Sequence, residues 1–97
     1  MRHFHRSHIT PAQVLSAADA FFTGLGLEPA LSLPRTRTFT GALGTLELSV
    51  RMEGGHYALI EARTDQMGES RLDRNVKRFF VRIHKQARPS HTLDAAY

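Results

Sequence analysis

Basic side chains recur with helical spacing near the C-terminal end of the chain. Five of them fall within about 80° of arc when residues are placed every 100° around a helix; they are Arg71, Arg74, Arg78, Arg82 and Lys85. We call this set the basic stripe. Arginine carries a planar fork of N–H donors that matches a phosphate group, and lysine adds a mobile point charge. The basic stripe therefore predicts a binding surface for nucleic acid or another polyanion.

The net charge of +4 at pH 7 is distributed unevenly along the 97 residues. Residues 1–65 hold six arginines and six acidic residues, and their charges cancel. Residues 66–90 hold seven basic residues and two acidic ones, which leaves +5. The basicity of the protein thus belongs to its final helical segment. The competing interpretation is a helix whose outer face is merely solvated by charged side chains.

Three histidines near the N-terminus are candidate metal ligands. On a strand, His3 and His5 would share one face and His8 would point to the other. No acidic residue lies near them in the sequence, so at most two imidazoles converge, and a stable site needs more ligands. We expect ordinary exposed strand histidines, with no metal and no cofactor.

Other catalytic arrangements are missing or have simpler explanations. The absence of cysteine excludes disulfides, thiolate metal sites and thiol nucleophiles. Gly41, Gly44, Gly54 and Gly55 fall in predicted hairpin turns, and none of them opens a helix as a phosphate-binding loop does. Glu47 and Glu61 would lie on adjacent strands near Arg51 and Arg63, where a cross-strand charge network explains them better than acid–base catalysis does. We therefore expect that the protein is not an enzyme.

Two amphipathic helices are predicted around the sheet. The first begins at Pro11 after a Thr10 N-cap, with Gln13 completing a capping box, and glycines end it. Its predicted buried stripe consists of Val14, Ala17, Ala18, Phe21, Phe22 and Leu25. The second runs from about Glu69 to Arg88, with Ser70 as its predicted N-cap. Opposite its basic stripe it carries an apolar stripe of Leu72, Val76, Phe79, Phe80 and Ile83.

The remaining segments have the patterns of strands. Strict alternation over residues 45–52 places Leu46, Leu48, Val50 and Met52 on one face. A Glu53–Gly55 turn then leads into a second strand over residues 56–64, which completes a hairpin. Weaker strand patterns cover residues 2–9, 30–33 and 35–41. The polar face of the sheet would display Thr45, Ser49, Arg51, Tyr57, Leu59 and Arg63. The neighbouring strand over residues 35–41 would add either Thr36, Thr38 and Thr40 or Arg35, Arg37 and Phe39 to this face.

Together these elements predict an α+β fold of the order β-α-β(3–4)-α, with a curved antiparallel sheet and two helices packed on one face. We expect a single domain over residues 1–89 and a flexible C-terminal tail over residues 90–97.

This order resembles one half of the TATA-box-binding protein, and it resembles the larger helix-grip domains of START and polyketide-cyclase type. In the latter, a strand and helix like RHFHRSHITPAQVLSAADAFF open the chain and a basic helix like GESRLDRNVKRFFVRIHKQ closes it. The resemblance covers residues 2 to about 88 in architecture and involves no specific motif.

The resemblance implies two further uses of the fold. A helix-grip domain would hold an apolar ligand between the sheet and the final helix, lined by Phe22, Met52, Phe79 and Phe80. A TATA-box-binding architecture would grip DNA with the sheet, although this chain shows no obvious pair of phenylalanines on that face to wedge between bases. Joining two such faces in a homodimer is at least as good an explanation of the same surface.

Size and hydropathy set the remaining expectations. A chain of this length builds one small core, and dimerisation is one way to bury more surface, so we expect a homodimer. No apolar stretch approaches the roughly 20 residues of a membrane span, and the first residues lack the apolar run of a signal peptide. We expect a cytoplasmic protein without a membrane span.

Overall fold

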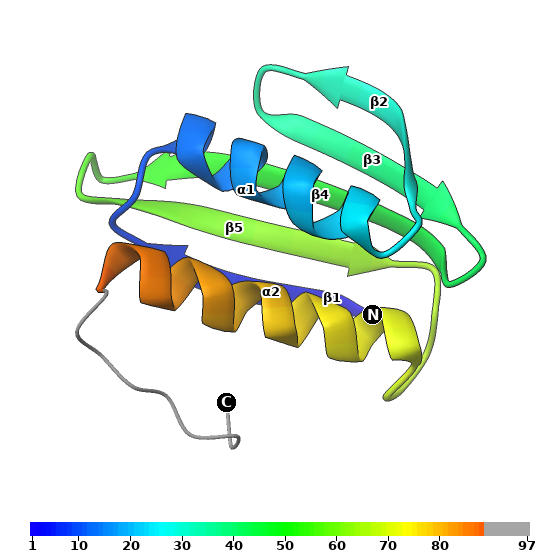
Figure 1. Ribbon diagram of the computed structural model, residues 1–97. Helices are drawn as coiled ribbons and strands as arrows, with labels where there is room; N and C mark the ends of the chain where they lie inside the picture. Colours follow the sequence, from blue (N-terminus) through cyan, green and yellow to red (C-terminus); the bar gives the residue numbers. More distant parts are fainter. Residues whose placement is uncertain (89–97) are drawn as a thin grey trace.

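Five antiparallel strands form one open sheet in the computed structural model, and two helices cover one of its faces (Figure 1). The structure describes residues 1–88, so the predicted tail over residues 90–97 lies outside the described residues. In chain order the elements are β1 (Arg2–Ser7), α1 (Pro11–Gly24), β2 (Glu28–Leu33), β3 (Thr36–Gly41), β4 (Gly44–Glu53), β5 (Tyr57–Thr64) and α2 (Arg71–Ala87). The predicted α+β fold class is confirmed, with four strands between the helices.

The strand order across the sheet is β1-β5-β4-β3-β2. Strands β2 to β5 form a meander, and β1 pairs with β5 from Arg2 opposite Arg63 to Ser7 opposite Ala58. The first and last strands of the chain, β1 and β5, are thus neighbours in the sheet. Helix α2 lies along the β1 side of the sheet, and α1 lies over its middle (Figure 1). The two edges of the sheet are β1 and β2.

Both helices begin as their sequences predict. At the start of α1 the Gln13 backbone N–H donates to Thr10 Oγ1 at 3.2 Å, and the Thr10 N–H donates to Gln13 Oε1 at 2.9 Å. At the start of α2 the Asp73 N–H donates to Ser70 Oγ at 3.0 Å. These side chains satisfy backbone donors that the first turn of a helix leaves without partners.

Aromatic rings fill the middle of the core between the sheet and the helices. The Phe22 ring of α1 lies 5.1 Å from the Phe79 ring of α2 and 5.4 Å from the Phe39 ring of β3. Leu46, Leu48 and Val50 of β4 and all five predicted apolar residues of α2 are buried around them. Because Phe39 faces the helices, the threonines of β3 face outward, which decides between the two alternatives that the sequence left open.

Three expectations about burial are wrong. Leu25 is exposed because it caps the end of α1, whereas Leu15, which the predicted stripe did not include, is buried near the start of the helix. Met52 is 44 % exposed because it lies at the far end of β4, beyond the residues that pack into the core. His3 and His5 are partly buried rather than exposed, because the inner face of β1 lies under α2.

Candidate functional site

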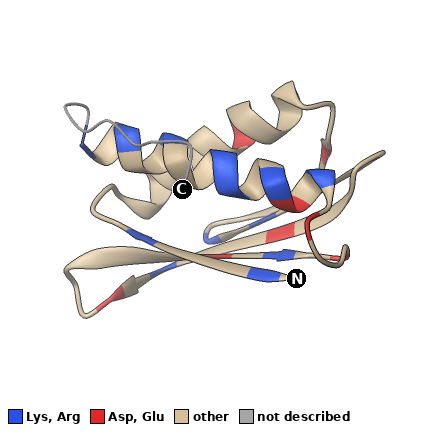
Figure 2. Ribbon diagram, turned by 90° about the horizontal axis from the view of Figure 1, so that it is seen from below, with Lys and Arg blue, Asp and Glu red and all other residues tan. Residues whose placement is uncertain are grey.

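The basic stripe lies on the side of α2 opposite its buried apolar residues, and Figure 2 shows basic residues along the length of this helix. All five of its side chains are exposed, whereas the apolar residues on the opposite side of the helix are buried. Packing against the core therefore fixes the direction in which the cations point. The prediction that both stripes belong to one helix is confirmed by this arrangement.

The cations of the basic stripe have no acidic partner within residues 1–88. Other basic residues of the described chain do form ion pairs: Lys77 with Glu69 at 3.2 Å, Arg37 with Asp19 at 3.1 Å, and Arg2 with Glu61 at 3.3 Å. The positive charge of the stripe is thus not compensated locally, and it is available to an anionic ligand.

A shallow hollow of about 280 Å³ lies within the N-terminal half of the stripe. Its lining consists of Arg71, Arg74, Asn75 and Arg78. The Asn75 amide donates to the Arg71 carbonyl at 2.9 Å, which holds this polar side chain against its own helix. Three guanidinium groups around one hollow offer several N–H donors to an oxyanion such as a phosphate.

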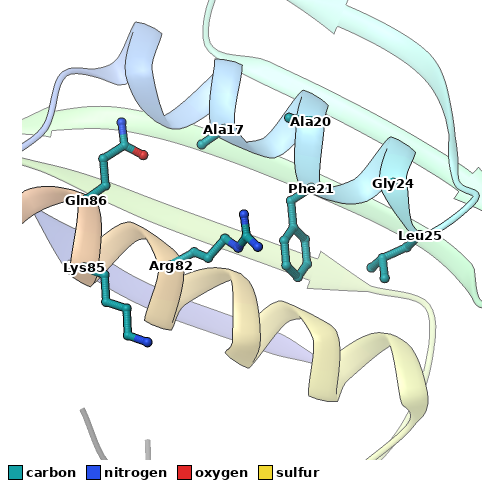
Figure 3. A pocket seen from close by; sticks show the side chains of 8 residues that line it. All are labelled: Ala17, Ala20, Phe21, Gly24, Leu25, Arg82, Lys85 and Gln86. Atoms are coloured by element: carbon teal, nitrogen blue, oxygen red, sulfur yellow. The ribbon is translucent and has the colours of Figure 1, made fainter. Parts of the chain in front are cut away.

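A larger open groove of about 850 Å³ separates α1 from α2 (Figure 3). One wall belongs to α1 and is mostly small and apolar, and the other belongs to α2 and is polar. The lining residues are Ala17, Ala20, Phe21, Gly24, Leu25, Arg82, Lys85 and Gln86. Figure 3 shows the Phe21 ring pointing from α1 toward α2 and the Arg82 guanidinium pointing toward α1. The guanidinium carbon lies 5.7 Å from the centre of the Phe21 ring.

Sequence reasoning missed this groove because it treated Ala17, Phe21 and Leu25 as one buried stripe. The structure places them at its margin, where Ala17 and Phe21 are only partly buried. The sequence does contain a signal for the groove: Ala17, Ala20 and Gly24 recur every three to four residues, and small residues at this spacing leave space beside α2.

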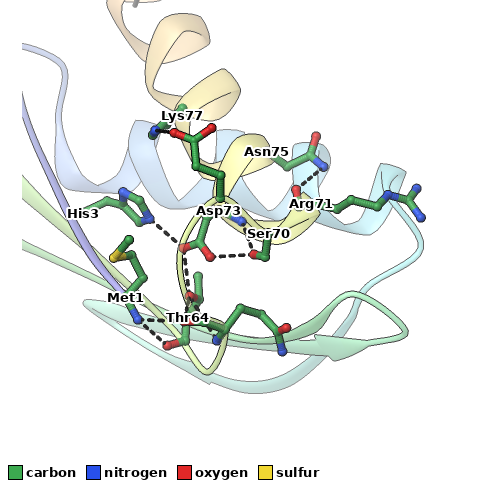
Figure 4. Close-up of polar contacts among 10 residues, drawn as sticks. Met1, His3, Thr64, Ser70, Arg71, Asp73, Asn75 and Lys77 are labelled. Atoms are coloured by element: carbon green, nitrogen blue, oxygen red, sulfur yellow. Dashed lines mark hydrogen bonds and ion pairs between the residues drawn. The ribbon is translucent and has the colours of Figure 1, made fainter.

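A buried polar cluster joins α2 to the edge of the sheet (Figure 4). Asp73 is 1 % exposed, and its Oδ1 lies 2.7 Å from His3 Nε2 and accepts a hydrogen bond of 2.9 Å from Thr64 Oγ1. Its Oδ2 accepts from the Ser70 hydroxyl. Burial raises the pKa of Asp73, but hydrogen bonds from Ser70, His3 and Thr64 outweigh it and hold this pKa below its usual range.

The other histidines do not join His3. His5 stacks on Phe80 with ring centres 5.1 Å apart, and burial, followed by the nearby charge of His84, lowers its pKa. His8 is exposed and lies edge-on to Tyr57 at 6.4 Å. Within the described chain, no group of three or more histidine, cysteine, aspartate or glutamate residues is arranged to hold a metal ion. His3 and His5 do share a strand face as predicted, but each is engaged with α2.

The residues predicted to line an apolar ligand site are only partly brought together. Phe22 and Phe79 are fully buried and in ring contact, and the Phe80 ring lies 6.2 Å from that of Phe79. Met52 does not reach them. The three phenylalanines pack on one another, and neither the groove nor the hollow is lined by any of the four.

The outer face of the sheet is a mixed surface of charges and hydroxyls. Glu47 stands directly opposite Arg63, and Glu61 stands opposite Ser49 on the adjacent strand, so the two carboxylates are diagonal neighbours as predicted. The ion-pair partner of Glu61 is Arg2 on β1, which the sequence did not indicate. Phe4 also lies on this face and is 53 % exposed. Surface pairs of this kind contribute little to stability.

Comparison with known proteins gives no family assignment. No protein-family model matches the chain, and no curated protein matches it. Within residues 1–88, no helix is both long enough and apolar enough to cross a membrane.

Proposed function

We propose that this protein is a non-enzymatic binding module that holds a polyanion, foremost nucleic acid, on the basic stripe of α2. The observation that carries the proposal is the set of five exposed cations on one helix face, none of which has an acidic partner within residues 1–88. Uncompensated charge of this kind releases counterions when it meets a phosphate backbone.

The geometry of α2 suits an extended ligand. Arg71 and Lys85 are fourteen residues apart, which corresponds to about 21 Å along the helix axis. A nucleic-acid strand in a duplex carries one phosphate about every 3.4 Å of helix axis, so the stripe faces several phosphates at once. The opposite side of α2 packs in the core, so the backbone that carries the cations is already ordered before a ligand binds. Less conformational entropy is therefore lost on binding.

The charge of the remaining chain supports the same surface. Residues 1–65 sum to zero, and ion pairs such as Arg2 with Glu61 and Arg6 with Glu53 neutralise part of the sheet's outer face. A polyanion approaching the molecule is therefore steered toward α2.

The test compares binding of fluorescein-labelled single-stranded and duplex DNA of random sequence between about 50 and 200 mM salt. We expect salt-sensitive binding, with a slope of log K against log salt of up to about −4.5 on duplex DNA, because five phosphate contacts contribute about −0.9 each. The variant R71Q/R74Q/R78Q should bind at least about tenfold more weakly at low salt, and the magnitude of its slope should be smaller by about 2 to 3.

The matched control is R35Q/R51Q/R63Q, which removes the same charge from the sheet side of the molecule. This control should retain most of the binding. Equal losses in both triple variants would assign the binding to net charge alone, and the absence of salt-sensitive binding by the unaltered protein would overturn the proposal.

We also propose that two copies associate through β2. This edge strand is exposed along its whole length, and Leu31 and Leu33 are 47 % and 49 % exposed on its outer face. An edge strand offers unpaired backbone N–H and C=O groups to another strand, and the two leucines add apolar area.

A further inference from the structure

The groove between α1 and α2 adjoins the basic stripe. Arg82 and Lys85 belong to both, so any chain whose phosphates lie along the stripe passes the mouth of the groove. Figure 3 shows Arg82 directed into the groove and Lys85 extending away from α1. A charged surface and a mostly apolar recess are therefore continuous on one side of the molecule.

The α1 wall of the groove is apolar and has room for a planar group. Ala20 and Gly24 are exposed, and a Cβ atom added at Gly24 would meet nothing within 4 Å. The Phe21 ring lines the same groove and supplies an aromatic surface there. The recess of about 850 Å³ is of the size that proteins use for small-molecule ligands.

The Phe21 ring is held in place from below. It packs edge-to-face on Phe22 at 5.0 Å and lies 5.6 Å from the Phe79 ring. Both of those rings are fully buried, so Phe21 is anchored in the core while part of it faces the groove. Binding at this ring costs little side-chain entropy.

The α2 wall supplies groups that recognise a nucleotide. The Arg82 guanidinium is a planar cation that stacks on aromatic rings and also pairs with phosphate. Gln86 points toward α1 in Figure 3, and its amide has both a donor and an acceptor for the edge of a base.

We propose that the groove takes an unstacked nucleobase, so that the protein binds single-stranded nucleic acid through a base at Phe21 and Arg82 and through phosphates on the stripe. This inference rests on the proposed function of the basic stripe. In a duplex the bases are paired and stacked inside, whereas a single strand presents its bases to an aromatic surface. An aromatic surface beside a row of cations is the combination that single-strand binding uses.

The decisive experiment separates the base from the phosphate. Three labelled probes of equal length are compared at one low salt concentration: a single-stranded DNA, the same backbone with abasic sites throughout, and a duplex. We expect the single strand to bind about fivefold or more tightly than the abasic strand, because a base stacked on an aromatic side chain contributes that much.

Two variants localise the effect. F21L keeps an apolar side chain against Phe22 and Phe79, and G24L fills the open part of the groove. Both should weaken single-strand binding about fivefold and leave abasic binding unchanged. The control F4L alters an exposed aromatic ring on the far side of the sheet and should change neither.

The outcomes distinguish the two proposals. Equal, salt-sensitive binding of the single strand and the abasic strand overturns the base-binding groove and leaves the basic stripe intact. A loss of affinity in F4L equal to that in F21L also overturns it. If no probe binds at low salt, the proposed function itself fails, and the base-binding groove fails with it.

Discussion

Asp73 shows how much one polar residue contributes to the placement of α2. Three side chains from the strands and the helix cap, His3, Thr64 and Ser70, contact its carboxylate. The carboxylate is buried, so it stays ionised only because these groups replace water. A carboxylate in this position fixes the start of α2 over strands β1 and β5. The direction in which the basic stripe points depends on this placement of the helix.

At the residue scale, we predict that the free energy of unfolding decreases as the pH falls below about 4. The folded pKa of Asp73 lies below the unfolded value of about 3.9. Its contribution to stability is therefore complete above the unfolded pKa, and it is lost as the pH falls through the folded one. Asp65 acts in the same direction, because the Thr45 N–H and then the Gln66 amide lower its pKa.

Urea unfolding at several pH values between about 2 and 7 checks this prediction. The free energy of unfolding of D73N should be about 2 kcal/mol lower at pH 7, because buried donors and acceptors lose their partners. This free energy should also change less with pH in D73N than in the unaltered protein. A D73N protein with the same acid dependence as the unaltered protein would contradict the role given to Asp73.

At the scale of the element, the capping box of α1 leads to a prediction about stability. T10A should lower the free energy of unfolding by about 1 kcal/mol, since the Gln13 N–H loses its acceptor at the N-terminus of the helix. Urea unfolding followed by circular dichroism measures the change. S16A, at an exposed position in the middle of the same helix, should change stability by less than about 0.5 kcal/mol; a similar cost in both variants would argue against the cap.

The two sides of α2 lead to opposite predictions. F79A removes a fully buried ring that contacts Phe21 and Phe22, and it should cost about 3 kcal/mol or more. R78Q lies on the exposed side and should stay within about 0.5 kcal/mol of the unaltered protein. Thermal and urea unfolding of both variants check the contrast, and a large loss in R78Q would mean that the stripe serves the fold rather than a ligand.

At the scale of the whole molecule, we expect a particle of about twice the 10.9 kDa chain mass in solution. L31E/L33E places charge on the outer face of β2 and should shift the mass to that of one chain. The control M52E/M67E puts the same charge at two exposed methionines elsewhere. Light scattering after gel filtration measures the mass, and a single-chain mass for the unaltered protein would rule out the dimer.

Local patterns carried much of the prediction of this fold. The Thr10–Gln13 capping box, the alternation along β4 and the two stripes of α2 each depend on residues a few positions apart, and the structure confirms them because backbone geometry fixes such spacings. Burial at the ends of elements was harder to predict. Leu25 and Met52 fit their periodic patterns, but tertiary packing does not extend over them.

A period of 3.6 residues places every side chain on a known arc, so the spacing of residues was enough to predict that one helix carries an apolar side and a basic side. The neighbours of that helix, by contrast, depend on the tertiary fold. His3 meets Asp73 across 70 residues of chain, and Arg82 meets Phe21 across the gap between two helices. These contacts depend on the pairing of β1 with β5 and on how both helices pack on the sheet, and no local spacing of residues encodes either arrangement.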